Sequence, residues 1–275
     1  MRKKLSLVLV AVLAASSVVV GGAAQAAPSA KAAKVNYHLV KAGNLIVGMT
    51  LQFRPEMYLD SKGKPAGYDV QLVSAFAKSL GLKLVIKNMD FGGLIPGLMS
   101  RQFDMLSVGL TNNPERAKSM TFSREYMPYA TVLTAAPGQK IGNTFEAWNT
   151  AGVKITALQG STAAKLVKST FPNATLVEFP EQSAAFLEVA SGRANGIVVE
   201  ANLSGDYMKS NPGQMANVAL PKLIDVGYGS MAVQLGNTAL KNSLNKFICT
   251  NQKNGTLAKI HLATMGYALP ALPAC

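Results

Sequence analysis

The stretch LMSRQFDMLSVGL, residues 98–110, and the stretch VASGRANGIVVEA, residues 189–201, share one local plan. In both, a helical pattern ends in a short turn containing Ser and Arg, and an apolar run follows a polar residue, Asp104 or Asn195. Short apolar runs bounded by turn signals are typical of buried strands. The two stretches therefore predict the same helix–turn–strand unit in each half of the chain.

Further strand and helix patterns alternate around these two units. Asp69 is expected to cap a helix over 70–81, and Gly81 to end it. Strands that alternate with helices indicate parallel sheets covered by helices on both faces. We therefore predict an α/β protein with two Rossmann-like lobes, each with a central, mostly parallel sheet, joined by two crossings near 128–131 and 227–230.

The N-terminus has the layout of a secretory signal peptide. Residues 2–4 are basic, residues 5–20 form an apolar run, and the small residues of Ala24-Gln25-Ala26 offer a cleavage site. A retained membrane anchor is the alternative, but the run is short for one. We predict export to the periplasm and the following division of the chain: signal peptide 1–26, flexible leader 27–42, lobe 1 over 43–129 plus 230–275, and lobe 2 over 130–229.

The chain has a formal net charge of +13, three charges of which lie in the predicted signal peptide, leaving 13 − 3 = +10. The lysines are scattered, with no basic run and no interleaved aromatic residues, so nucleic acid is not expected as a partner. The two cysteines, Cys249 and Cys275, are expected to form a disulfide in an exported protein, with two free thiols as the alternative. No metal site is expected, because His38 and His261 are far apart in the sequence.

Arg116 follows a predicted strand and lies just after Asn113-Pro114, a pair that favours the start of a helix. Helix N-termini favour anions, and a guanidinium can hold a carboxylate through two parallel hydrogen bonds. Parallel α/β sheets bind ligands beyond the carboxyl ends of their strands, where Glu200 also lies. A cation on one lobe and an anion on the other predict a zwitterionic ligand such as an α-amino acid.

The chain resembles the type II periplasmic solute-binding proteins of family 3, the amino-acid-binding components of ABC importers. The resemblance covers about residues 44–267. Its most specific part is DFGGLIPGLMSRQFDMLSVGLTNNPERAKSMTFSREY, residues 90–126, and weaker matches follow in the family's order, including LQGSTA and YGSMAVQ. It implies a binding protein without cofactor, not an enzyme, that acts as a monomer and delivers its ligand to a membrane permease by hinge closure.

The resemblance also implies a ligand site. Arg116 would bind the ligand's α-carboxylate with Thr111 and the N–H of Thr162, beside Ser161, while the Gly109 carbonyl and Glu200 would hold the α-ammonium. Phe53 and Phe91 would be aromatic walls on either side of the ligand's side chain. The family usually has Asp at the position of Glu200. It often has an acidic or polar residue at the position of Thr50, so threonine there argues against lysine or arginine as ligand.

Other interpretations stay open at this stage. Arg116 can be a surface residue or part of a structural ion pair, Glu200 can cap a helix, and Phe53 and Phe91 can belong to the core. The family's usual Pro-Pro-Phe-Glu reads RPEM here, residues 54–57, which puts unusual charges at the cleft mouth. Arg54 can favour an acidic ligand or be an exposed surface residue, and a neutral or acidic amino acid or a related carboxylate is the expected ligand. An enzyme is the alternative function, because secreted cyclohexadienyl dehydratases resemble the same fold and a glutamate at a strand end in the cleft, Glu200, can act as a general acid.

Overall fold

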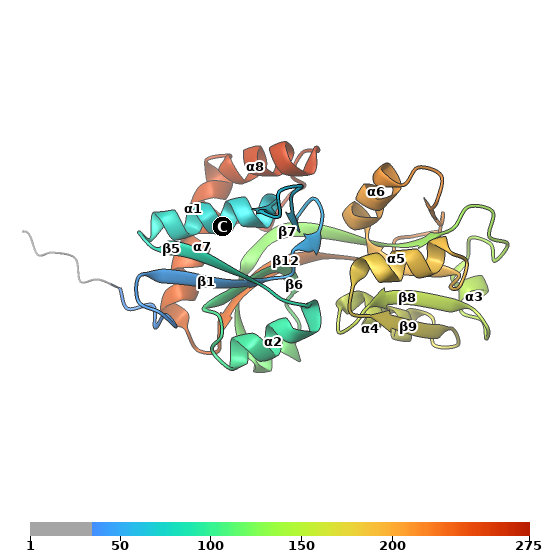
Figure 1. Cartoon of the computed structure of the whole chain (residues 1–275), viewed down its shortest axis with the longest axis horizontal. Coiled ribbons are helices and arrows are strands. Elements are labelled where there is room, and N and C mark those ends of the chain that lie inside the picture. Colours follow the sequence, from blue (N-terminus) through green and yellow to red (C-terminus); the bar gives the residue numbers. More distant parts are fainter. Residues whose placement is uncertain (1–34) are drawn as a thin grey trace, which may run out of the picture. The chain divides into compact units, whose positions relative to one another are not determined.

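Two long strands, β7 (Met120–Ala135) and β12 (Asp225–Gln234), organise the fold. They pair antiparallel over most of their length and lie in the middle of a nine-stranded sheet. The computed structural model describes residues 35–275, so the predicted signal peptide and residues 27–34 of the predicted leader lie outside it. Figure 1 shows β7 and β12 running between two groups of elements, which we call the first and second lobes.

The first lobe contains the parallel strands β5 (Lys83–Asn88), β1 (Asn44–Met49) and β6 (Met105–Thr111), in that spatial order. A small antiparallel sheet, β2 (Gln52–Phe53), β3 (Met57–Leu59) and β4 (Pro65–Ala66), precedes the first helix. Four helices complete this lobe: α1 (Tyr68–Ser79), α2 (Phe91–Met99), α7 (Thr238–Lys253) and α8 (Thr256–Met265).

The second lobe repeats the arrangement with parallel strands β10 (Gly196–Glu200), β8 (Lys154–Leu158) and β9 (Thr175–Phe179). The short strand β11 (Ala216–Asn217) pairs with β7. Trp148, fully buried, packs with Phe171 and other apolar side chains in this lobe. The helices of the second lobe are α3 (Phe145–Trp148), α4 (Thr162–Thr170), α5 (Gln182–Ala190) and α6 (Ala201–Ser210).

The predicted fold class is therefore confirmed: each lobe is built on three parallel strands with helices packed around them, and the strands that pass between the lobes are antiparallel to their neighbours. β12 begins at Asp225, before the predicted crossing near 227–230, and runs through it to Gln234. The sequence pattern does not indicate β7 as a continuous strand at all. Pairing with β12 extends both strands, because each supplies backbone hydrogen-bond partners to the other.

The prediction that Asp69 caps the first helix is wrong. Helix α1 begins two residues earlier than predicted, at Tyr68, with Gly67 in the N-cap position, and the Asp69 side chain is fully buried. Its Oδ2 atom accepts hydrogen bonds from Tyr126 Oη at 2.6 Å and Ser107 Oγ at 2.8 Å. These two hydroxyl groups hold the carboxylate inside the lobe, so it is not available to cap the helix.

The predicted disulfide between Cys249 and Cys275 is confirmed and ties the end of the chain to helix α7. Arg124 supports the same tail, since its guanidinium donates to the carbonyl of Pro273 at 2.7 Å. At the other end, the Asn237 side chain donates to the Tyr37 carbonyl at 2.8 Å, so the last residues of the predicted leader contact the first lobe.

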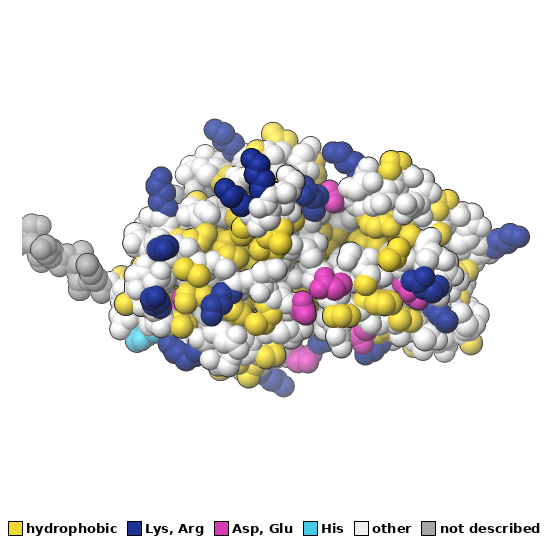
Figure 2. Space-filling view, viewed as in Figure 1, with side chains coloured by type: hydrophobic (Ala, Val, Ile, Leu, Met, Phe, Trp, Pro, Cys, Tyr) yellow, Lys and Arg dark blue, Asp and Glu magenta, His cyan; other side chains and the backbone are white. Residues whose placement is uncertain are grey.

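Basic side chains are scattered over the face of the molecule seen in Figure 2 and form no single patch there. This distribution agrees with the spacing of the lysines in the sequence. Within residues 35–275, no helix combines the length and the apolar character needed to cross a bilayer.

Candidate functional site

A pocket lies where the carboxyl ends of the parallel strands of both lobes meet. All eight residues predicted to bind a ligand line it. Its free volume is about 30 Å³, far below the about 300–1,000 Å³ of ordinary small-molecule pockets, so the two lobes lie close together around it. The predicted residues in the wall are Phe53, Phe91, Gly109, Thr111, Arg116, Ser161, Thr162 and Glu200.

Arg116 opens a single turn of 3₁₀ helix, Arg116–Lys118, directly after β6. The helical segment starts two residues after Pro114, where the sequence predicts its first position, and Glu115 is its N-cap. The Asn113 side chain still accepts a 2.9 Å hydrogen bond from the Arg116 amide and holds the backbone before this turn. The Arg116 side chain is buried, 7 % exposed, and points into the pocket. Burial lowers the pKa of Arg116, and the nearby carboxylates of Glu115 and Glu200 oppose that shift, so the guanidinium stays charged at physiological pH.

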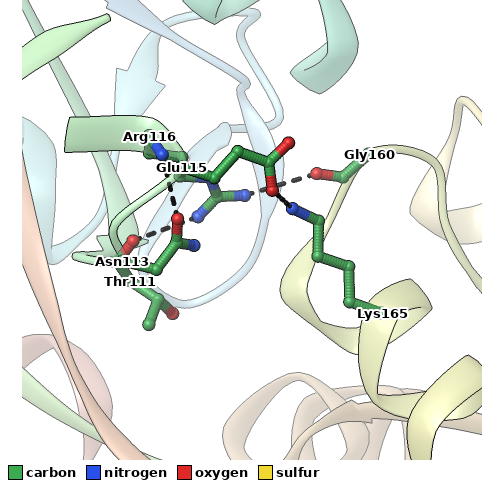
Figure 3. A network of polar contacts seen from close by, with 6 residues as sticks. All are labelled: Thr111, Asn113, Glu115, Arg116, Gly160 and Lys165. Atoms are coloured by element: carbon green, nitrogen blue, oxygen red, sulfur yellow. Dashed lines mark hydrogen bonds and ion pairs between the residues drawn. The ribbon is translucent and has the colours of Figure 1, made fainter. Parts of the chain in front are cut away.

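The Arg116 guanidinium bridges the two lobes. It donates to the carbonyl of Thr111 in its own lobe and to the carbonyl of Gly160 in the other, both at 3.3 Å (Figure 3). Beside it, Glu115 forms an ion pair with Lys165 of helix α4, again across the lobes. Both of these side chains are largely exposed, so this pair contributes little to stability.

The second lobe presents the N-terminus of α4 to the pocket. The Ser161 hydroxyl accepts from the Ala164 amide at 3.1 Å and caps the helix, so its oxygen is already engaged. The first-turn amide of Thr162 has no such partner within the helix, because the first N–H groups of a helix have none. Glu200 ends β10 and precedes α6, but its side chain makes no capping hydrogen bond. Burial raises the pKa of Glu200, and the charge on Arg116 opposes this shift.

Phe53 and Phe91 lie against each other at one side of the pocket. Their ring centroids are 6.2 Å apart and the rings are tilted by 45°. Arg116 lies over Phe91, with its guanidinium carbon 5.9 Å from the ring centroid. In this closed arrangement the two rings contact each other, and a ligand side chain would have to separate them to be held between aromatic walls.

Gly109 is held by a buried hydrogen-bonded chain. Its amide donates to Tyr126 Oη at 3.1 Å, and Tyr126 in turn donates to Asp69. Gly109 has a φ of +58°, and a Cβ atom at this position would collide with the hydroxyl of Tyr129. Glycine is therefore required here both for the backbone conformation and for the close approach of Tyr129.

The sequence prediction missed three polar residues of the pocket: Glu56, Tyr129 and Gln182. Glu56 could have been found in the RPEM segment, where a carboxylate replaces the phenylalanine that the family usually has. Tyr129 lies in one of the two predicted crossings, and Gln182 opens helix α5. The Gln182 side chain is 5 % exposed, and its amide nitrogen has no hydrogen-bond partner among residues 35–275.

The pocket thus combines one buried guanidinium and two carboxylates from Glu56 and Glu200 with free main-chain donors and two aromatic rings. Such a set can hold a small ligand that carries both a carboxylate and an ammonium group. The contacts come from both lobes, so they can all form only when the lobes are close together.

Residues 45–266 match the family of bacterial extracellular solute-binding proteins, family 3. The chain belongs to this family, and its two-lobed fold is that of the type II periplasmic amino-acid-binding proteins. Among its relatives is the ABC transporter arginine-binding protein 1 of Escherichia coli (strain K12), 26 % identical over 218 residues, which span 78 % of this chain and 87 % of that protein.

Solved structures show the same similarity to amino-acid-binding proteins. An ancestral arginine-binding protein bound to glutamine is 32 % identical and has a TM-score of 0.76, covering 82 % of this chain and all of that one. One relative is an enzyme, the cyclohexadienyl dehydratase of Pseudomonas aeruginosa (strain PAO1), 26 % identical over 164 residues, which span 59 % of this chain and 61 % of the enzyme.

Proposed function

We propose that this protein is the exported binding component of an ABC importer and captures an α-amino acid between its two lobes. The observation that carries the proposal is the buried Arg116 guanidinium, which faces Glu200 across a pocket lined by both lobes. Arg116 would bind the ligand's carboxylate together with Thr111 and the amide of Thr162. Glu200 and the Gly109 carbonyl would bind its ammonium group. The names of the relatives, which refer to amino-acid binding and ABC transport, support this reading.

Capture would proceed by opening and closing of the cleft along β7 and β12. In the open form the ligand contacts one lobe, and closure adds the contacts of the other lobe, so the ligand stabilises the closed form by the affinity that it gains there. The ligand's carboxylate would replace the Gly160 carbonyl as partner of Arg116. A charged acceptor makes a stronger hydrogen bond with a guanidinium than a neutral carbonyl does. The closed complex would then be presented to the permease.

The test begins with a thermal-shift screen against the twenty L-amino acids, because a ligand that binds only the folded protein raises its melting temperature. The best ligand is then titrated calorimetrically into the wild type, Arg116→Ala and the control Lys118→Ala. Lys118 is an exposed basic residue in the same 3₁₀ turn. We expect Arg116→Ala to weaken binding by about 100-fold or more and Lys118→Ala to leave it unchanged. Near-wild-type affinity of Arg116→Ala would refute this assignment.

A dehydratase is the second candidate, and one observation favours it. Glu56 is a buried carboxyl group in the pocket, and burial together with Asp69 and Glu200 raises its pKa well above the usual range, as a general acid requires. Incubation with prephenate or arogenate distinguishes the two functions. An enzyme would release the aromatic product with turnover, whereas a binding protein would at most bind the compound.

A further inference from the structure

Strand β2 of the first lobe contacts helix α5 of the second lobe. The side-chain oxygen of Gln52 in β2 accepts a 2.7 Å hydrogen bond from the main-chain amide of Gln182, the first residue of α5. The two residues are 130 positions apart in the sequence, so only the approach of the two lobes brings them together. Gln182 lines the ligand pocket, whereas Gln52 does not.

The main-chain amide of Gln182 lies at a helix N-terminus that its own lobe leaves uncapped. The first N–H groups of a helix have no intrahelical acceptor, and the side chain of the N-cap residue commonly satisfies one of them. The N-cap residue of α5 is Glu181, whose side chain makes no capping hydrogen bond. Gln52 supplies an acceptor from the other lobe instead, and its partly negative oxygen lies at the positive end of the helix dipole.

Thr50 fixes the orientation of the Gln52 side chain. The Gln52 side-chain amide donates a 2.7 Å hydrogen bond to Thr50 Oγ1, and Thr50 is 1 % exposed. Because the NH₂ group of the carboxamide is held by Thr50, its oxygen is left to accept from α5. A side chain that is oriented in advance loses less conformational freedom when it forms a contact, which makes the contact more favourable. Thr50 does not line the pocket, so it contacts Gln52 and not the enclosed space.

This contact differs from other polar contacts between the lobes. Under the proposed function, a ligand carboxylate replaces the Gly160 carbonyl as partner of Arg116. The ion pair between Glu115 and Lys165 is largely exposed. The hydrogen bond from the Gln182 amide to Gln52 uses no atom that is proposed to bind the ligand, and it is therefore compatible with a bound ligand.

We propose that Gln52, oriented by Thr50, is a positioning residue of the ligand site that holds α5 against the first lobe and slows release of the ligand. This inference rests on the amino-acid-binding function proposed above and concerns the regulation of its site. In an open form the Gln182 amide would bond to water, and closure would exchange that water for Gln52. The gain arises only in the closed form, so it affects release of the ligand and not its first encounter with the protein.

The same contact fixes the place of the Gln182 side chain. Its amide nitrogen is buried, lines the pocket, and has no hydrogen-bond acceptor among residues 35–275. A buried donor of this kind requires an acceptor, because an unsatisfied one is unfavourable. Gln52 thus acts on the pocket through Gln182, without a contact of its own to the ligand.

The experiment compares variants of Gln52 with the best ligand of the thermal-shift screen. Affinity is measured by calorimetry and the dissociation rate by stopped-flow fluorescence. Gln52→Ala removes the acceptor, and we expect it to release the ligand about three- to tenfold faster, to bind it more weakly by the same factor, and to leave the association rate unchanged.

Two further variants serve as matched comparisons. Gln52→Glu keeps an acceptor oxygen at the N-terminus of α5, where a negative charge is favourable, and should stay near the wild type. The control Gln71→Ala changes an exposed glutamine in helix α1 of the same lobe and should release the ligand at the wild-type rate.

A double-mutant cycle tests whether Thr50 acts through Gln52. Thr50→Val removes the hydroxyl group that holds the Gln52 side chain. If Thr50 orients Gln52, the double variant Thr50→Val/Gln52→Ala loses no more affinity than Gln52→Ala alone. A merely structural role of Thr50 would instead give losses that add up, and this result would overturn the orienting role.

Two more results overturn the inference and can be told apart from failure of the proposed function. A wild-type dissociation rate in Gln52→Ala would show that the contact does not hold the ligand-bound form. Equal losses in Gln52→Ala and Gln52→Glu would show that the acceptor oxygen is not the cause. In both cases amino-acid binding by the wild type itself stands. If no amino acid of the thermal-shift screen binds the wild type, the proposed function fails instead, and the inference about Gln52 falls with it.

Discussion

The guanidinium of Arg116 donates a 3.3 Å hydrogen bond to the main-chain carbonyl of Gly160 and so connects the two lobes at the centre of the pocket. Gly160 directly precedes the capped N-terminus of helix α4. A carboxylate that entered between these residues would meet the guanidinium on one side and the first-turn amides of the helix on the other. This contact is where the proposed function places the ligand's carboxylate.

The first prediction concerns the geometry of this contact. Arg116→Lys keeps the positive charge but cannot offer two parallel N–H groups to a carboxylate. We expect binding about tenfold or more weaker than in the wild type, and stronger than in Arg116→Ala. Calorimetric titration of all three proteins with the same ligand measures this order. Equal affinity of Arg116→Lys and wild type would mean that charge alone matters at this position.

The second prediction concerns Gly109, where a Cβ atom would collide with the hydroxyl of Tyr129 and where φ is +58°. We expect Gly109→Ala to lower the free energy of unfolding by about 3 kcal/mol or more, because an unfavourable backbone conformation and a steric clash add together. The control is Gly63→Ala, with a φ of +70° and open space around the position, which should lose only about 1–2 kcal/mol. Urea unfolding measures both variants, and equal losses would contradict the clash.

The third prediction follows from the buried Asp69 carboxyl, whose pKa burial raises from 3.8 to about 6, while hydrogen bonds from Tyr126 and Ser107 oppose the shift. The folded state therefore holds this proton more tightly than the unfolded state does. Consequently Asp69 makes the free energy of unfolding fall as pH rises from about 4 to above 6, by up to about 3 kcal/mol in total.

Asp69→Asn removes this titration. We expect its stability between pH 4 and pH 7 to fall less steeply with pH than that of the wild type, as measured by urea unfolding at several pH values. Parallel curves for the two proteins would show that Asp69 is not the group responsible.

The fourth prediction concerns the disulfide between Cys249 and Cys275, which are separated by 26 positions. A cross-link over a loop of this length restricts the unfolded chain and stabilises the fold by about 3 kcal/mol in the chain-entropy description. We expect Cys275→Ser to lower the free energy of unfolding by up to that amount. Wild type treated with a reducing agent should behave like the variant, and the reducing agent should have no effect on the variant itself.

Several elements could be predicted from the sequence alone because their signals are local. The helix–turn–strand units that end in β6 and β10 form where their patterns predict them, and a helical turn follows Asn113-Pro114. The cysteines pair as an exported protein with only two of them suggests. Hydrophobic periodicity and caps depend on residues within a few positions of each other, so one sequence is sufficient to read them.

Only the tertiary structure decided which residues that are distant in the sequence come into contact. β7 became a continuous strand through pairing with β12, about a hundred residues further on. Asp69 was predicted to cap a helix but is a buried carboxylate, because the hydroxyl groups of Ser107 in β6 and Tyr126 in β7 donate hydrogen bonds to it. Glu56 lines the pocket, and the Asn202 side chain that donates a hydrogen bond to it lies in the other lobe. The sequence by itself determined most of the elements and the family, and it predicted Arg116 as a residue of the site. The set of polar side chains in the pocket depended on which residues the two lobes bury together, and local patterns do not report such burial.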